Sequence, residues 1–295
     1  MPTLKVYPHG LTGGVAPSVT NRTPPKRGDV SGWSNASTRS NTRFLYSVEP
    51  GGLHGTGLAL SLTVRDCPKS HAEWAAMRRA MQMRLTRLGM VRMHWLTEWQ
   101  RRGVPHLHAA VWFRESPHAD VLRLARLVSH HWLEVAGKCG ARLSGQHVTG
   151  ITDEVGWFKY LSKHAVRGLH HYQRSPESVP QGWSKTGRMW GYVGAWPLRE
   201  EMRLELDQAG WFRFRRLVRS WRRSDARAAG CGRRLSKARR MLRCRDRALS
   251  EVRGVSEWIP QDDALRLVAT VAALGHRVEQ VWQTQPNSRR GPVRA

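Results

Sequence analysis

The sequence predicts an α+β fold in which helices pack on an antiparallel sheet. The first observation is the alternation of apolar side chains at period two over residues 58–64, which is typical of a strand. The second is the three- and four-residue spacing of apolar side chains over residues 70–88, which predicts a helix. The third is a pair of strand-like runs, residues 90–100 and 105–113, joined by a short connection that ends at Gly103. Because the connection is so short, the two strands should pair antiparallel.

The elements that follow complete the order β-α-β-β-α-β-α-β. Apolar spacing predicts a second helix up to residue 137, and a short strand follows over residues 146–151. A third helix is expected over residues 152–167, because two carboxylates lie in its first turn and complement the helix dipole. A last strand is expected over residues 188–196.

Composition divides the chain into three parts. Residues 1–43 are dense in Pro, Gly, Ser, Thr and Asn and predict a flexible N-terminal arm. Residues 44–197 hold the expected sheet and helices. Residues 198–295 read as a basic helical region for DNA binding or an accessory role, with fifteen Lys or Arg against two acids over residues 211–247 and a final amphipathic helix over 262–282. Aromatic residues interleaved with these arginines favour base stacking beside phosphate contacts, against the alternative of a solubilising face.

The charge of the chain points to a polyanionic partner. Forty-nine Lys or Arg stand against 22 Asp or Glu, a formal net charge of +27, and nucleic acid is the first candidate. No apolar run reaches bilayer length, so a membrane partner is not expected. The N-terminus has no secretory pattern, which predicts a cytoplasmic protein. The four cysteines form no Cys-x-x-Cys pair, so free thiols are expected.

The strongest local signal joins Glu98 to His106 and His108. Side chains alternate along a strand, so the two histidines point to one face. If residues 101–103 form a three-residue hairpin loop, Glu98 lies directly opposite His106 on that same face. Two imidazoles and a carboxylate suit a divalent ion that acts as a Lewis acid on a phosphodiester. The alternative is that the two histidines lie on an exposed strand face without binding a metal. The opposed Glu98 favours the metal site. His94 shares the same strand face and is a possible outer residue of that site.

A second signal is Tyr160 followed by Lys163 on the third helix. Positions i and i+3 are neighbours on one helical face, so a phenol and an ammonium can address the same phosphate. Without supporting context, such a pair is more often a packed ring beside a solvated charge.

These motifs together resemble the HUH superfamily of rolling-circle replication initiators. PHLHAAVWF (residues 105–113) resembles the family's His-hydrophobic-His strand, WFKYLSKHA (157–165) its Tyr-x-x-Lys helix, and GLALSLTVRD (57–66) its first motif. The order of the motifs favours an initiator over a relaxase. Gly156 stands where some phage initiators carry a second tyrosine, so the chain resembles a single-tyrosine member.

The resemblance implies a fold and a mechanism. The fold is a ferredoxin-like or RRM-like HUH core. Glu98, His106 and His108 would hold Mg²⁺ or Mn²⁺, and Tyr160, aided by Lys163, would cleave a single-stranded DNA origin to leave a 5′-phosphotyrosine and a 3′-hydroxyl. The implied partners are a host helicase and a host polymerase, in a phage or plasmid cycle. A single-tyrosine transposase and a non-catalytic basic DNA-binding protein remain as alternatives.

Overall fold

The computed structural model describes residues 1–15, 30–115, 120–162 and 171–281. The chain divides into two compact units. Unit 1 combines residues 1–22 with residues 199–295, and unit 2 holds residues 23–198. No helix in the described part of the chain is both long enough and apolar enough to cross a membrane. All four cysteines are free thiols, as expected.

Unit 2 is built on a five-stranded sheet in which every neighbouring pair is antiparallel. The strand order is β6-β3-β5-β4-β7. The strands are β3 (Thr56–Thr63), β4 (Met90–Trp99), β5 (Pro105–Phe113), β6 (His147–Gly150) and β7 (Trp190–Gly194). The predicted α+β class with an antiparallel sheet is therefore confirmed.

The hairpin between β4 and β5 has the predicted register. Glu98 is paired with His106, and the Gln100 N–H donates to the Val104 carbonyl at 2.9 Å. Gly103 closes the three-residue loop with φ of +72°, a conformation that a residue without a Cβ adopts at little cost.

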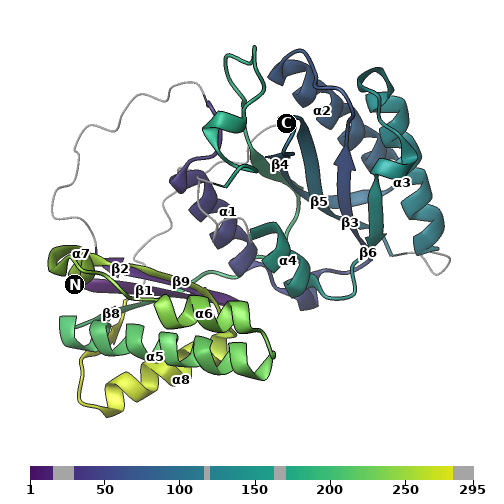
Figure 1. Ribbon diagram of the computed structural model, residues 1–295. Coiled ribbons are helices and arrows are strands. Elements are labelled where there is room, and N and C mark those ends of the chain that lie inside the picture. The colour runs from purple at the N-terminus through teal and green to yellow at the C-terminus, as the bar shows by residue number, and fades with distance from the viewer. Residues whose placement is uncertain (16–29, 116–119, 163–170, 282–295) are drawn as a thin grey trace. The chain divides into compact units, whose positions relative to one another are not determined.

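Helices cover both faces of this sheet (Figure 1). On one face lie α2 (His71–Arg87) and α3 (Val121–Ala136), and on the other lie α1 (Asn35–Ser47) and α4 (Glu154–Ser162). The remainder of the expected third helix, residues 163–167, lies outside the described residues.

Specific contacts fix these helices to the sheet. The Trp74 indole of α2 donates to Thr97 Oγ1 at 3.0 Å, and the Trp132 indole of α3 donates to the Thr63 carbonyl at 2.9 Å. On the opposite face, the Phe158 ring of α4 lies 6.1 Å from the ring of Trp112. The chain also forms short 3₁₀ turns at Pro50–Gly52, Gly137–Cys139, Leu143–Gly145 and Pro176–Ser178.

The prediction of a flexible arm over residues 1–43 is wrong. Most of the described residues in this range form strands or part of a helix. Helix α1 begins at Asn35, and the Ser34 side chain caps it by accepting the Ser37 N–H. Trp33, which precedes this helix, is buried. At the start of the chain, β1 (Pro2–Tyr7) and β2 (Gly10–Val15) form a hairpin that belongs to unit 1. Residues 16–29 lie outside the described part.

Unit 1 has its own five-stranded antiparallel sheet, in the order β10-β8-β1-β2-β9. The later strands are β8 (Met202–Leu206), β9 (Val255–Trp258) and β10 (Val278–Gln280). Its helices are α5 (Gln208–Ala228), α6 (Gly232–Arg240), α7 (Arg247–Val252) and α8 (Gln261–Ala273). The basic region is therefore a mixed α/β structure rather than a helical one. The last helix ends at Ala273 instead of about residue 282, because Gly275 turns the chain at φ of +80° and β10 follows.

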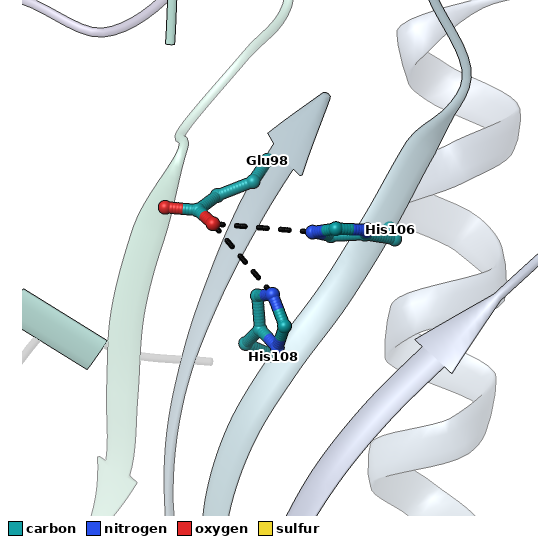
Figure 2. A group of neighbouring side chains, drawn as sticks. All are labelled: Glu98, His106 and His108. Carbon is teal, nitrogen blue, oxygen red and sulfur yellow. Dashed lines mark ion pairs between the residues drawn. The ribbon is translucent and has the colours of Figure 1, made fainter. Parts of the chain in front are cut away.

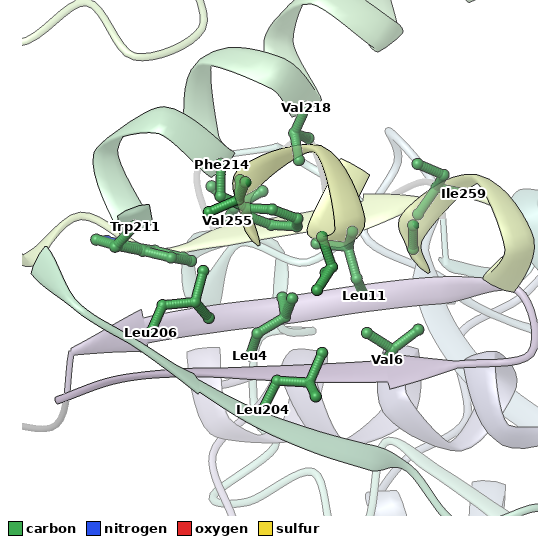
Figure 3. Close-up of a cluster of buried hydrophobic side chains, with 13 residues drawn as sticks. Leu4, Val6, Leu11, Leu204, Leu206, Trp211, Phe214, Val218, Val255 and Ile259 are labelled. Carbon is green, nitrogen blue, oxygen red and sulfur yellow. The ribbon is translucent and has the colours of Figure 1, made fainter. Parts of the chain in front are cut away.

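The aromatic residues of the basic region form the core of unit 1. Trp211, Phe214 and Val218 lie on one face of α5, are fully buried, and pack with Leu4 and Leu11 of the hairpin (Figure 3). Residues three and four apart on a helix share one face, so α5 buries its apolar side and leaves most of its arginines outside. The expected base stacking by Trp211 and Phe214 is wrong, because their rings are inaccessible to a ligand.

Candidate metal centre and tyrosine site

The sheet of unit 2 brings two imidazoles and a carboxylate together. Glu98 Oε2 lies 3.9 Å from His106 Nε2 and 3.6 Å from His108 Nε2 (Figure 2). One ligand atom from each residue lies within 4.8 Å of the others. Ligand atoms bound to one small divalent ion at about 2.1 Å lie at most about 4.2 Å apart, and both measured separations fall inside that limit.

The surroundings of these atoms also fit an ion. Glu98 is completely buried, His108 nearly so, and His106 is half-buried. His106 Nε2 is buried and makes no hydrogen bond within the described part of the chain. A buried polar nitrogen in that state is costly unless it meets a ligand. Two nitrogens and one carboxylate occupy only part of an ion's coordination shell and leave positions for water or phosphate oxygens.

Ser61 on β3 orients His108. In the register of β3 with β5, Ser61 is the direct partner of His108, and its Oγ lies 2.7 Å from His108 Nδ1. When Nδ1 carries the proton and donates to Ser61, the lone pair of Nε2 is directed toward Glu98, which is the tautomer that a metal ligand needs. Sequence reasoning missed Ser61, because it falls between the apolar positions Leu60 and Leu62 of β3, where a polar residue is ordinary.

Arg174 holds the other oxygen of Glu98. Its Nε and Nη2 each lie 3.0 Å from Glu98 Oε1, and Nη2 also donates to the Leu161 carbonyl at 3.4 Å. The guanidinium is 1 % exposed and lies 3.8 Å from the centre of the Trp33 ring. Trp33 in turn donates its indole N–H to the Thr97 carbonyl at 2.9 Å. The carboxylate is thus fixed with Oε1 toward the arginine and Oε2 toward the histidines.

Replacing Arg174 with methionine should lower the free energy of unfolding by about 3–5 kcal/mol, because the variant leaves a buried carboxylate without its counter-charge. Urea unfolding of the metal-free protein measures this loss. The matched test is a double-mutant cycle with Glu98→Gln. The double variant should lose clearly less than the sum of the two single losses. Strictly additive losses would contradict a direct Arg174–Glu98 interaction.

Tyr160 of α4 lies beside this group. Its ring is half-buried, packs edge-on against the His108 imidazole with centroids 5.5 Å apart, and stacks on Trp157 with centroids 4.8 Å apart. The structure therefore brings four of the five predicted site residues together: Glu98, His106, His108 and Tyr160. The fifth, Lys163, lies outside the described residues.

The first turn of α4 leaves little room for a second tyrosine at position 156. The Gly156 N–H donates to Asp153 Oδ1 at 2.8 Å. A Cβ added at Gly156 would lie 2.1 Å from Asp153 Oδ2, so a larger residue would displace this cap.

His94 belongs to the core and lies outside the candidate metal group. The prediction that it is a possible outer residue of the metal site, because it shares the strand face, is therefore wrong. Its Nε2 lies 2.7 Å from Asn41 Oδ1 of α1, and its ring stacks on Phe44 with centroids 5.5 Å apart. Complete burial lowers the pKa of His94 to about 3, and the charge of Arg174 adds to this effect.

The buried, neutral His94 should make unit 2 sensitive to acid. Its folded pKa of about 3 lies below the unfolded value of about 6.5, so the unfolded state binds the proton more tightly. The stabilising contribution is complete above pH 6.5 and is lost as pH falls from about 6.5 toward 3, by up to about 1.4 kcal/mol per pH unit.

Urea unfolding at pH 7 and pH 4.5 measures this loss. His94→Gln, which keeps an N–H donor for Asn41, should flatten the pH dependence, whereas His130→Gln at an exposed site should leave it unchanged. The same loss between the two pH values in wild type and in His94→Gln would contradict the prediction.

Three proteins that are named for replication match 88–94% of this chain. A protein of Xylella fastidiosa (strain 9a5c) named "Putative replication protein" is 50% identical over 285 residues, which cover 94% of this chain and 99% of that protein. A protein of the same name from strain Temecula1 is 51% identical over 265 residues, 88% of this chain and 99% of its own length. "Replication-associated protein G2P" of Pseudomonas phage Pf3 is 44% identical over 279 residues, 94% of this chain and 99% of the phage protein. No protein-family model matches the sequence. No solved structure matches it either.

Proposed function

This chain belongs to the family of replication proteins represented by these relatives, and from that premise we propose that it initiates rolling-circle replication by nicking single-stranded DNA. The observation that carries the proposal is the contact between the Tyr160 ring and His108, one of three residues that form a candidate metal group. A nucleophile beside a Lewis-acid site is an arrangement suited to phosphodiester transfer.

Tyr160 is the proposed nucleophile. Its phenolic oxygen attacks the scissile phosphorus, a Tyr160 O–P bond forms, and the P–O3′ bond breaks. The phenol loses its proton and the departing 3′ oxygen gains one, so the products are a 5′-phosphotyrosine and a free 3′-hydroxyl. The stack on Trp157 and the contact with His108 hold the ring in one orientation, which lowers the entropic cost of the attack.

Glu98, His106 and His108 are the proposed ligands of Mg²⁺ or Mn²⁺. When bound, the ion would polarise the scissile phosphate and offset its developing charge. Imidazole nitrogens favour Mn²⁺ over Mg²⁺, which prefers oxygen ligands. Ser61 and Arg174 act through these ligands, because each fixes the orientation of one of them. Lys163 is assigned, from its place in the Tyr-x-x-Lys motif, to steady the negative charge on the phosphate.

The products define the partners. A free 3′-hydroxyl primes a host polymerase, a host helicase would separate the strands, and the linked 5′ end stays on the protein until religation releases a circular strand. The relatives include a phage protein and two proteins of a bacterium, so they support a phage cycle and a plasmid cycle alike. The names of the relatives also favour replication over transposition, and a purely DNA-binding role would leave the Glu98, His106, His108 and Tyr160 cluster without a purpose.

Cleavage of single-stranded DNA tests this function. The full chain is incubated with circular single-stranded DNA and Mn²⁺, and the products are separated under denaturing conditions with and without EDTA. We expect a linear product together with a protein–DNA adduct that survives SDS, both dependent on the metal. Cleavage that leaves no covalent adduct would reject the tyrosine mechanism. The assay is repeated with single-stranded DNA from the replicons of the relatives, and absence of cleavage there as well would reject the nicking function.

A further inference from the structure

Unit 1 contains an open groove of about 480 Å³ between α5 and the segment that follows α6. Arg216 and Arg219 of α5 line one wall, and Arg243 and Arg247 line the other. The volume is that of a small-ligand site. All residues that line the groove belong to unit 1, and none belongs to the candidate metal centre.

The walls of the groove are fixed by internal contacts. Arg215 is buried, and its Nη1 donates to the carbonyls of Ser250 at 2.7 Å and Arg253 at 3.0 Å, which ties the end of α7 to α5. In the turn after α6, Leu242 has φ of +68°. A bulky residue is costly in this left-handed conformation, and such strain is retained mainly where the surrounding structure or a function demands it.

The groove presents hydrogen-bond donors with few acceptors. Five arginines line it against one acid, Glu251. The Nε atoms of Arg215 and Arg219 are buried and donate to nothing within the part of the chain that the structure describes. Buried guanidinium N–H groups without an acceptor are unfavourable. The exposed guanidinium groups of Arg216, Arg243 and Arg247 offer N–H donors that a ligand with several anionic oxygens can reach.

We propose that this groove binds the phosphodiester backbone of single-stranded DNA. Phosphate oxygens match the arginine donors in charge and geometry. The half-buried Phe212 ring, which lines the same groove, offers an aromatic surface beside them, as in many grooves that bind single strands. The Phe212 ring favours a single strand over a duplex, because unpaired bases can stack on an aromatic side chain and paired bases are already stacked on one another. The proposal rests on the proposed function insofar as that function supplies a single-stranded substrate.

Two triple variants of the full chain test the groove. In the first, Arg216→Gln, Arg243→Gln and Arg247→Gln remove the exposed arginines of the groove. In the control, Arg227→Gln, Arg233→Gln and Arg240→Gln remove three exposed arginines of α5 and α6 that do not line it. Both variants lose the same net charge. Binding of a fluorescent single-stranded oligonucleotide is measured at several salt concentrations in EDTA, where cleavage is suppressed.

The groove variant should flatten the slope of log K against log salt by about 2, since each phosphate contact on a single strand contributes about 0.7. The control variant should keep the wild-type slope. Equal changes in both variants, or none in either, would overturn the proposal. An equal slope change with a duplex of the same sequence would also overturn it. Because no cleavage is measured, these outcomes do not depend on whether Tyr160 is a nucleophile, and the adduct assay judges that question separately.

Discussion

Tyr160→Phe should neither nick single-stranded DNA nor form a covalent adduct. The substitution keeps the ring that stacks on Trp157 and packs against His108, and it removes only the phenolic oxygen that we propose as the nucleophile. Loss of the nucleophile in another enzyme has cost a factor on the order of 10⁶ in rate, so the residual activity should be undetectable in a gel assay. The measurement is the SDS-resistant adduct, with peptide mapping of the wild-type product.

Two other tyrosines serve as matched controls. Tyr192 is exposed on β7 and Tyr172 lies in the loop that precedes Arg174, and neither belongs to the candidate metal group. Tyr192→Phe and Tyr172→Phe should nick at the wild-type rate. Oligonucleotide binding by Tyr160→Phe should be unchanged, which separates loss of chemistry from loss of fold. A mapped adduct on Tyr172 or Tyr192 would remove Tyr160 from the mechanism.

The metal group could be predicted because its geometry is local. A three-residue loop fixes the register of two consecutive strands, and strand alternation then decides which side chains share a face. Glu98 and His106 are separated by only eight positions, and the observed pairing is the one that loop length demands. The position of Tyr160 beside His108 could not be predicted from spacing, because it depends on how α4 packs on the sheet. The resemblance to the HUH superfamily was what connected Tyr160 to the metal site.

Arg174 could not be predicted in this way. It lies 76 positions from Glu98, in a polar loop without periodicity, and its buried side chain contacts Glu98, Trp33 and the Leu161 carbonyl. An arginine in a basic chain gives no sign in the sequence that it will be one of the few that are buried. Ser61 could not be recognised either, because it lies between the apolar positions of β3 and its contact with His108 depends on the pairing of β3 with β5.

Unit 1 was missed because its sheet is assembled from distant segments. Strand β1 pairs with β8, so that Leu4 lies opposite Leu204, and no local pattern reports a contact across about two hundred positions. The short alternation in residues 2–7 was obscured by the Pro- and Gly-rich stretch beside it. The prediction of basic helices in this region was correct for α5, α6 and α7, but the composition did not indicate which surface would cover Trp211 and Phe214.

This architecture limits what truncation can show. Cutting the chain after Pro197 removes β8, β9 and β10 and leaves the apolar faces of β1 and β2 without their partners. Weakened DNA binding in such a chain could reflect misfolding of the N-terminal hairpin. Point substitutions on the exposed arginines of unit 1 avoid this problem, because they leave the core of Leu4, Leu11 and Trp211 intact.

His106→Ala and His108→Ala should each abolish divalent-dependent nicking and leave oligonucleotide binding largely unchanged. Each substitution removes one of the three proposed ligands, and two remaining ligands would hold a labile ion poorly. Titration of Mn²⁺ followed by electron paramagnetic resonance measures the loss of binding directly, independent of activity. His130→Ala, at an exposed histidine of α3, should bind Mn²⁺ and nick as the wild type does.

Ser61→Ala extends this series to a residue that touches only a ligand. Its hydroxyl lies 2.7 Å from His108 Nδ1, so the variant keeps all three ligand atoms and loses the hydrogen bond that sets the tautomer of one. Removal of such a partner typically lowers metal affinity or activity by roughly 10- to 100-fold. We therefore expect Mn²⁺ binding by Ser61→Ala to lie between that of the wild type and that of His108→Ala, with nicking restored at high Mn²⁺.

Unchanged nicking in His106→Ala or His108→Ala would remove the metal assignment. A loss in Ser61→Ala that excess Mn²⁺ fails to reverse would mean that Ser61 acts on the fold of β3 rather than through His108.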